Sequence, residues 1–277
     1  MNLKLRTNSQ FTIDNSQLNI TGSKSETNRL LLLQALFPNI TLTNTSNSDD
    51  SEVMQKALKG NEEIVDIHHA GTAMRFLTAF FAVNEGREVV LTGSQRMTER
   101  PIKVLVEALE QLGAKISYEN EVGYPPIQIK GQKITASKVS IPANVSSQYI
   151  SALLLVAPKL ENGIEITLVG EITSVPYIKM TLALLNDLDV KTSFEGNVIS
   201  VYPKQEVASK IMTVESDWSS ASYFFSLVAL AKSASISLTS YKETSLQGDS
   251  ALIEIYKQMG VATHFENNKM TLVKQTG

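Results

Sequence analysis

The fold is decided by residues 146–202, which read SSQYISALLLVAPKLENGIEITLVGEITSVPYIKMTLALLNDLDVKTSFEGNVISVY. Apolar residues recur here first with the period of a helix, then with that of a strand, a second helix and two closing strands. The expected elements are helices over 146–157 and 176–188 and strands over 164–169, 190–194 and 198–202. Two amphipathic helices and a small sheet bury their apolar faces only against another layer, so the stretch predicts one α/β unit.

The same order of elements is found on both sides of this unit. We predict one copy over 72–129 and another over 219–273, and a shorter copy begins at Ser25 with its hairpin reduced to 63–67. The second helix of each full copy ends where Gly or Asp suits a positive φ. The matching tripeptides are Leu112-Gly113-Ala114, Leu188-Asp189-Val190 and Met259-Gly260-Val261. The chain is therefore built from repeats of one unit, each roughly 70 residues long.

The repeats predict the domain organisation, because each unit needs neighbours to cover its apolar faces. Three units over 21–213 are expected to form a complete domain, and 214–277 is expected to be one unit of a second domain whose remaining units are absent. Residues 1–20 alternate apolar and polar side chains and are predicted to supply strands to that incomplete domain.

Composition excludes several classes of protein. The chain is 43% hydrophobic and 19% charged, as in a soluble globular protein, and its net charge of −3 gives no overall basic field for nucleic acid or an anionic membrane. The absence of cysteine excludes disulfides, thiolate metal sites and cysteine nucleophiles, and three histidines make a histidine metal site improbable. With no signal-like or membrane-length apolar run, the sequence predicts a cytoplasmic protein.

The arginines are few and lie in the first part of the chain. There are six, and none follows Arg100. In Gly22-Ser23-Lys24-Ser25-Glu26-Thr27-Asn28-Arg29, a serine that can cap the next helix stands beside Lys24 and one turn before Arg29. Such a helix start favours a phosphate or carboxylate cradle, although an ordinary serine cap with a solvated lysine and arginine explains the same residues.

Four further helix starts carry polar or cationic groups. They are the glycine turn at Gly71, the loop 93–101 with Arg96 and Arg100, the group Ser146, Ser147 and Gln148, and the pair Ser174 and Tyr177. Arginine forks match phosphate and carboxylate, and hydroxyls and amides suit a polyhydroxyl or phosphate ligand. The alternatives are plain helix starts, a solvated loop and a core tyrosine, and His68 and His69 are interpreted as polar loop residues.

Taken in this order, the motifs resemble the enolpyruvyl transferases, and within them the 5-enolpyruvylshikimate-3-phosphate synthases. The resemblance rests on Gly22-Ser23-Lys24-Ser25 to Arg29, Ala70-Gly71-Thr72-Ala73-Met74-Arg75, Arg96-Met97-Thr98-Glu99-Arg100-Pro101, Val145-Ser146-Ser147-Gln148, Ser174 to Tyr177, Ser219-Ser220-Ala221-Ser222-Tyr223-Phe224 and Gln247-Gly248-Asp249. It implies an inside-out α/β barrel of βαβαββ units, a monomer when complete, and no metal or organic cofactor.

The resemblance also implies a reaction and a set of site residues. The enolpyruvyl group of phosphoenolpyruvate moves to the 5-hydroxyl of shikimate 3-phosphate, a step of aromatic amino-acid biosynthesis, and phosphate is released. Implied contacts to shikimate 3-phosphate are Lys24, Ser25, Arg29, Ser146, Ser147, Gln148, Ser174 and Tyr177. Implied contacts to phosphoenolpyruvate are Lys24, Gly71, Arg96 and Gln148.

Some features depart from the family pattern. The family usually has a small or amide residue where His68 and His69 stand, and a proline where Phe76 stands. Its acid and base groups are expected beyond Gly277, so this chain is interpreted as an amino-terminal part with incomplete catalytic machinery. Two alternatives stay open: a binding module for shikimate 3-phosphate without catalysis, and the related transferase for a UDP-amino sugar, which usually carries a cysteine that this chain lacks.

Overall fold

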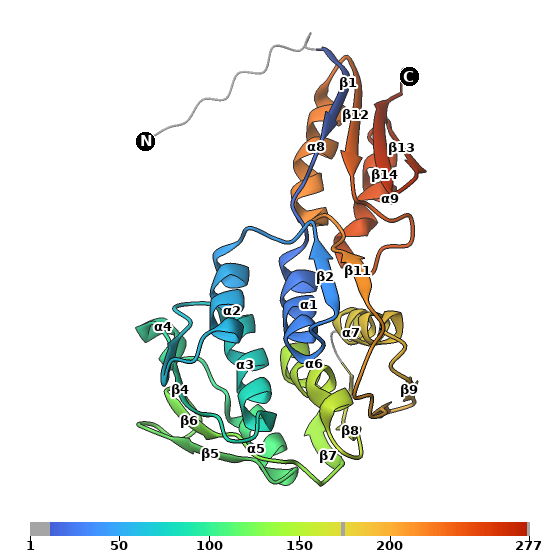
Figure 1. Cartoon of the computed structure of the whole chain (residues 1–277). Helices are drawn as coiled ribbons and strands as arrows, with labels where there is room; N and C mark the ends of the chain where they lie inside the picture. The colour runs from blue at the N-terminus through green and yellow to red at the C-terminus, as the bar shows by residue number, and fades with distance from the viewer. Residues whose placement is uncertain (1–11, 173–174, 276–277) are drawn as a thin grey trace. The chain divides into compact units, whose positions relative to one another are not determined.

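The computed structural model describes residues 12–172 and 175–275, which form two compact units (Figure 1). One unit spans residues 24–212, and the other combines the described residues before 24 with those from 213 onward. The larger unit contains α1 (Lys24–Leu36), β2 (Ile40–Thr43), α2 (Asp49–Lys59), β3 (Ile64–Asp66), α3 (Gly71–Val83), β4 (Glu88–Thr92), α4 (Gln95–Thr98), α5 (Lys103–Gln111), β5 (Lys115–Tyr118), β6 (Ile127–Lys130), β7 (Lys138–Pro142), α6 (Ser147–Val156), η1 (Ala157–Lys159), β8 (Ile164–Val169), α7 (Val175–Asp187), β9 (Thr192–Glu195) and β10 (Val198–Val201), and β11 (Lys210–Thr213) ends at its boundary. The smaller unit contains β1 (Thr12–Leu18), α8 (Trp218–Leu230), β12 (Ser233–Thr239), η2 (Gly248–Ala251), α9 (Leu252–Lys257), β13 (Val261–Glu266) and β14 (Lys269–Lys274).

Three four-stranded sheets share one topology, which confirms the repeat. Their strand orders are β3-β4-β6-β5, β7-β8-β10-β9 and β1-β12-β14-β13. In each, the first two strands are parallel and the last two form an antiparallel hairpin, with helices in the connections. The chain is thus a mixed α/β protein, and none of the sheets in its described part closes into a barrel. The predicted helix ends at Gly113, Asp189 and Gly260 have φ values of 100°, 56° and 74°, as the tripeptides require.

Helices fill the interior of the larger unit and sheets cover it (Figure 1). Almost every residue of α3 and α6 is buried, and both helices are apolar around most of their circumference, as a helix enclosed by protein must be. In α1, the four consecutive leucines Leu30 to Leu33 are likewise buried. This packing brings the starts of the helices, where their free N–H groups lie, into a shared region of the unit.

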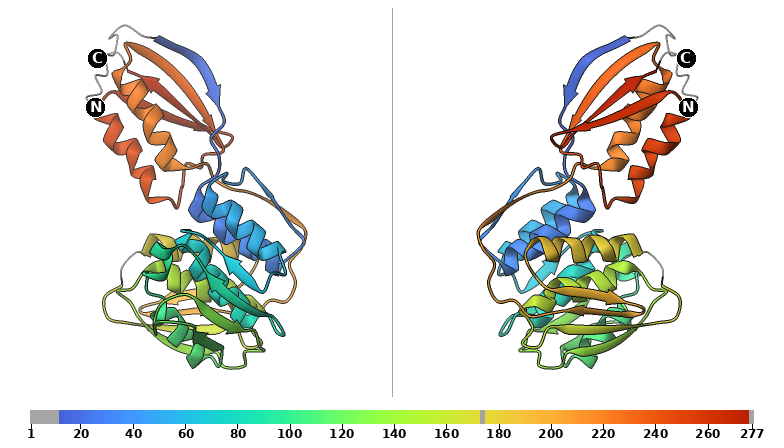
Figure 2. Two further views of the ribbon diagram at one scale, coloured as in Figure 1. Left: turned by 90° about the vertical axis from the view of Figure 1, so that its left-hand side faces the viewer. Right: turned by 90° about the vertical axis from the view of Figure 1, so that its right-hand side faces the viewer.

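The smaller unit has its own core. The chain places α8 and α9 on one face of the sheet, and β1 lies along its edge next to β12 (Figure 2). Trp218, Phe225 and Tyr241 fill the space between helix and sheet, with ring centroids of Trp218 and Tyr241 5.2 Å apart. The opposite side of the helices keeps large apolar side chains exposed: Tyr223, Leu227, Leu230, Ile255 and Met259.

Two expected elements differ from the structure, and one strand was not predicted. The hairpin predicted over 63–67 is wrong: Ile64–Asp66 form the single strand β3, which pairs with β4 because so short a segment has room for one strand only. The segment 138–142, for which we predicted no element, is β7, the parallel edge strand of the next sheet. The loop predicted over 93–101 contains the short helix α4.

Within the described residues, no helix combines the length and the apolar character needed to cross a membrane.

Candidate functional site

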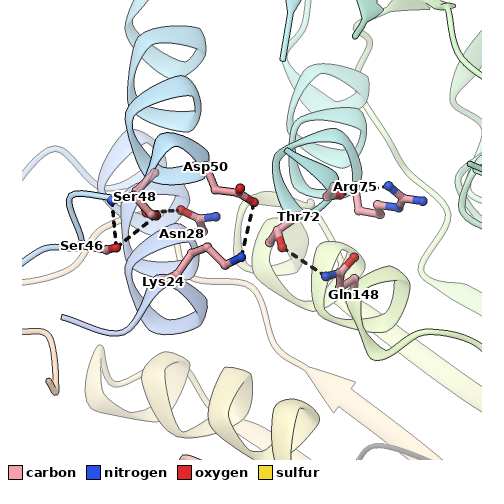
Figure 3. A network of polar contacts seen from close by, with 10 residues as sticks. Lys24, Asn28, Ser46, Ser48, Asp50, Thr72, Arg75 and Gln148 are labelled. Carbon is pink, nitrogen blue, oxygen red and sulfur yellow. Dashed lines mark hydrogen bonds and ion pairs between the residues drawn. The ribbon is translucent and has the colours of Figure 1, made fainter. Parts of the chain in front are cut away.

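The start of α1 holds the first group of predicted site residues. The helix begins at Lys24, so the expected cap at Ser25 is wrong and Ser25 lies in the first turn. The reason is the extended backbone just before it, where Gly22 and Ser216 form a bridge and the Ser23 N–H donates to the Glu215 carbonyl over 2.9 Å. The ammonium of Lys24 remains half-exposed, 3.9 Å from a carboxylate oxygen of Asp50 (Figure 3).

A chain of serine hydroxyls fixes the neighbouring side chain of Asn28. The Ser46 hydroxyl donates to Ser48, Ser48 to Ser51, and Ser51 to the Asn28 Oδ1 over 2.8 Å. These hydrogen bonds set the orientation of the Asn28 amide, because the amide oxygen is the acceptor. The Asn28 Nδ2 is buried with no hydrogen-bond partner among the described residues. Figure 3 shows the Asn28 amide and the Lys24 amine on the side of α1 that faces Thr72 and Gln148.

Arg29 is not the solvated arginine of the alternative interpretation. Its side chain is buried and donates to the Ser25 carbonyl over 2.7 Å and to hydroxyls of Thr181 and Ser151 over 2.8 and 3.0 Å. Burial lowers the pKa of Arg29 to about 10, so the guanidinium stays charged at neutral pH. Three of its five N–H groups donate to these acceptors, and the other two have no hydrogen-bond partner among the described residues.

The ring of Tyr177 covers this guanidinium, 5.8 Å from the Arg29 Cζ, and Phe76 lies 5.4 Å from it. Tyr177 is 46% exposed, so the alternative that placed it in the core is wrong. Together the two rings hold the guanidinium by cation–π contact. Ser174, which we predicted beside Tyr177, lies outside the described residues.

The start of α6 presents the amide and hydroxyls that the sequence indicated. Ser146 caps the helix, and its hydroxyl accepts the Gln148 N–H over 3.3 Å, while Ser147 is buried. The Gln148 side-chain amide donates to the Thr72 hydroxyl over 3.1 Å, which joins the start of α6 to the start of α3 (Figure 3). The structure therefore brings the motifs at Gly71 and Ser146 together, although they are far apart in the sequence.

Arg75 has a role that sequence reasoning missed. Its buried guanidinium donates to the Gly71 carbonyl over 3.1 Å and to the Pro101 carbonyl over 3.0 Å, and it also contacts the Met97 sulfur. Tyr149 donates to the same Pro101 carbonyl over 2.7 Å. Burial lowers the pKa of Arg75. The sequence does contain a signal of this role, which is an arginine within an otherwise apolar helix. A charged group buried in such a helix needs hydrogen-bond acceptors around it.

The hydrogen bonds of Arg75 and Tyr149 to the Pro101 carbonyl form a clamp on the residues after α4. A cavity of about 650 Å³ lies beside α4. The cavity is lined by His69, Ser94, Arg96, Met97 and Arg100. Neither the Arg96 nor the Arg100 guanidinium has a hydrogen-bond or ion-pair partner within the described part of the chain, and the Ser94 hydroxyl is buried there without one. A pocket with two available guanidinium groups and an unpaired hydroxyl is suited to a phosphate or carboxylate.

The turn at Gly93 cannot accept a side chain. A Cβ at this position would lie 2.4 Å from the His68 carbonyl oxygen, a backbone atom that cannot move aside. We expect Gly93→Ala to lower the free energy of unfolding by about 2 kcal/mol and to weaken anion binding in the cavity, because the loop must shift. Thermal unfolding and sulfate titration check this. Gly248→Ala is the control, since no atom lies within 4 Å of the added Cβ, and equal stability losses would contradict the prediction.

The smaller unit has a cavity of about 560 Å³, which we consider structural. Its buried carboxylate, Glu215, already accepts hydrogen bonds from Trp218 Nε1, the Lys242 N–H and the Ser245 hydroxyl. These bonds fix the loop after β12 to the start of α8. This carboxylate is thus engaged within the protein, unlike the guanidinium groups beside α4.

Comparison with known proteins identifies the family. The family model described as EPSP synthase (3-phosphoshikimate 1-carboxyvinyltransferase) matches residues 58–277. A 3-phosphoshikimate 1-carboxyvinyltransferase of Bacteroides fragilis is 43% identical over 258 residues, which are 93% of this chain and 63% of that protein. One of Histophilus somni is 38% identical over 275 residues, covering 88% of this chain and 63% of its own length.

A solved structure agrees with these relatives on the fold. The EPSP synthase of Acinetobacter baumannii superposes with a TM-score of 0.73 at 21% identity, over 95% of this chain and 64% of that one. The chain thus spans a little under two thirds of the length of the proteins it matches. On the family match and the identities of its relatives, this chain belongs to the EPSP synthase (3-phosphoshikimate 1-carboxyvinyltransferase) family.

Proposed function

We propose that this chain carries the shikimate 3-phosphate site, and part of the phosphoenolpyruvate site, of a 3-phosphoshikimate 1-carboxyvinyltransferase. The observation that carries the proposal is the grouping of cations and hydroxyls at the starts of α1, α3 and α6 (Figure 3), of which α3 and α6 are joined by the Gln148–Thr72 hydrogen bond. Both substrates are anions, and such helix starts combine free N–H groups with positive charge.

The shikimate 3-phosphate contacts are assigned to the helix starts of the larger unit. Lys24 supplies a mobile point charge, and Arg29 supplies two remaining N–H groups from a fixed position beneath Tyr177. The hydroxyl and amide contacts are Ser25, Ser146, Ser147, Gln148 and, outside the described residues, Ser174. A rigid guanidinium and oriented hydroxyls would hold the sugar-like ring so that its reacting hydroxyl has one direction of approach.

The phosphoenolpyruvate contacts are assigned to Arg96 and Gly71, with Lys24 and Gln148 reaching both ligands. Arg96 lines the cavity beside α4 as an unpaired guanidinium, and Gly71 is the first residue of α3. In the proposed reaction, a proton adds to the methylene carbon of phosphoenolpyruvate while the shikimate hydroxyl adds to the adjacent carbon. Loss of a proton and of phosphate from this tetrahedral adduct restores the double bond. The groups that move these protons are assigned to the part of the family that this chain does not match.

The exposed apolar side chains of α8 and α9 support a proposal on domain organisation. Tyr223, Leu227 and Leu230 recur along one face of α8, and Ile255 of α9 and Met259 just after it are exposed as well. We propose that further βαβαββ units of the same kind cover these side chains, so that 214–277 is one unit of a larger domain. We also propose a cytoplasmic location, which cell fractionation tests. A monomeric state of the complete protein is a further proposal, which light scattering tests.

Calorimetric titration with shikimate 3-phosphate tests the binding site directly. We expect Lys24→Ala to weaken binding about tenfold, because one cation–phosphate contact is lost. Lys103→Ala is the control, since within the described residues its ammonium pairs with Glu107 one helical turn away and with no other group. Equal affinity of wild type and Lys24→Ala would remove Lys24 from the site.

Catalysis is tested by complementation. Phosphate release is measured with both substrates, for this chain alone and after co-expression with the part of the Bacteroides fragilis protein beyond the matched region. Release only in the complemented sample supports the division of roles proposed above. Binding without release in either sample favours a non-catalytic binding module, and turnover by this chain alone would contradict the assignment of the proton-transfer groups.

A further inference from the structure

The start of α2 lacks the usual helix cap. Ser48 stands at the N-cap position, where a serine hydroxyl ordinarily accepts a hydrogen bond from a free N–H of the first turn, but within the described residues its hydroxyl accepts none of these. The hydroxyl donates instead to that of Ser51 over 3.2 Å, and Ser51 donates to the Asn28 Oδ1 over 2.8 Å. The serine at the cap position therefore serves to fix a side chain of α1.

The fixed side chain keeps one donor unused. Asn28 is fully buried, and the hydrogen bond from Ser51 requires its amide oxygen on that side, because only the oxygen accepts. The nitrogen has no hydrogen-bond partner among the described residues. Figure 3 shows it turned toward the side of α1 where the Lys24 amine and the Asp50 carboxylate lie. A buried N–H without an acceptor is costly, so we expect an acceptor to reach it in another state of the protein.

Asp50 is the acceptor placed to do so. It directly precedes Ser51 in α2, and its side chain is only 17% exposed, whereas Asp49 is exposed. Its carboxylate lies 3.9 Å from the Lys24 ammonium, well beyond the roughly 2.8 Å of a charge-assisted hydrogen bond. Lys24 is half-exposed on a flexible stem, so a bound anion can draw its ammonium away from the carboxylate.

We propose that Asn28 is a positioning residue that exchanges partners with Lys24. When an anionic ligand draws the Lys24 ammonium away from Asp50, the Asn28 Nδ2 donates a hydrogen bond to the carboxylate in its place. The proposal rests on the proposed function, since it assumes that Lys24 binds shikimate 3-phosphate. The exchange favours binding, because a partly buried carboxylate gains a donor as it loses its cation. Ser51 contributes by holding the amide in the required orientation.

The first test uses no ligand. In Lys24→Ala the carboxylate of Asp50 has no cation, so the Asn28 Nδ2 should donate to it in the free protein. NMR of the Asn28 side-chain amide should then show a proton signal shifted downfield, as hydrogen bonding to a carboxylate produces. The reference is the double variant Lys24→Ala/Asp50→Ala, in which the acceptor is missing and the shift should be absent. Identical Asn28 signals in these two variants would overturn the exchange.

The second test measures affinity for shikimate 3-phosphate by calorimetry. Ser51→Ala frees the Asn28 amide to rotate, and we expect about fivefold weaker binding. Thr78→Ala is the matched control, because it also removes a buried hydroxyl, which donates to the Met74 carbonyl within its own helix. Both variants should lose some stability, but Thr78→Ala should keep the wild-type affinity. Circular dichroism verifies that each variant is folded at the temperature of the titration.

A double-mutant cycle separates positioning from general support of the fold. In the Lys24→Ala background there is no ion pair to break, so Ser51→Ala should change the affinity by less than about twofold. A fivefold loss in both backgrounds would overturn the positioning role and leave the proposed binding site intact. Equal affinity of wild type and Lys24→Ala would instead contradict the assignment of Lys24, and with it the proposed function, whereas the ligand-free NMR comparison decides the exchange separately.

Discussion

Arg29→Ala is expected to lower the free energy of unfolding of the larger unit by about 3 kcal/mol and to weaken shikimate 3-phosphate binding about a hundredfold. The guanidinium is the common partner of the Ser25 carbonyl and of the hydroxyls of Ser151 and Thr181, which belong to three different helices. Removing it leaves these buried oxygens without their donor and opens a cavity between Phe76 and Tyr177. Thermal unfolding should show a fall in Tm of roughly 10 °C.

Two controls separate charge, geometry and folding. Arg87→Ala removes an exposed guanidinium that contacts the carbonyls of Asn61 and Glu62, and should change stability by less than about 0.5 kcal/mol. Arg29→Lys keeps a charge but cannot reach three acceptors in three directions, so it should recover only part of the stability. Affinity is measured below the unfolding transition of each variant. If Arg29→Ala unfolds like wild type, the buried contacts do not support the helices as described.

The second large effect is expected for Arg75→Met, which should lower the free energy of unfolding by about 2–3 kcal/mol and weaken sulfate binding in the cavity about tenfold. Methionine keeps the apolar volume but removes the guanidinium bonds to the Gly71 and Pro101 carbonyls, so that only Tyr149 still donates its hydroxyl to Pro101. The loop carrying Arg96 and Arg100 then loses its attachment to α3. Hydrogen exchange should be faster for the backbone amides of residues 94–100 than in wild type.

A double-mutant cycle with Tyr149→Phe tests this mechanism. Tyr149 and Arg75 donate to the same carbonyl, so their effects on stability should not add, and a coupling of about 1 kcal/mol is expected. Thr98→Ala serves as the matched control, because in the part of the chain that the structure describes its hydroxyl donates to the Gln95 carbonyl of the same helix and to no other group. Additive losses for Arg75 and Tyr149, or unchanged exchange of the loop amides, would argue against the clamp.

The sequence by itself determined the repeat and the chemical character of the site. Helices and strands follow from apolar periodicity, and the positive φ values at Gly113, Asp189 and Gly260 follow from the residues that adopt them without strain. The motif at Lys24 and the group at Ser146 could be predicted because free N–H groups, hydroxyls and cations at a helix start are local features.

Only the tertiary structure decided which of these side chains line a cavity and which are buried within the fold. Arg29 and Arg75 are buried because acceptors distant in sequence, such as Thr181 and Pro101, complete their hydrogen bonds, and no local pattern reveals such partners. Strand β3 pairs with β4, and strand β7 pairs with β8. These strands too are defined by partners elsewhere in the chain and not by their own short sequences. His69 differs from His68 only through the direction of one backbone turn, so its place in the cavity was decided by the folded chain.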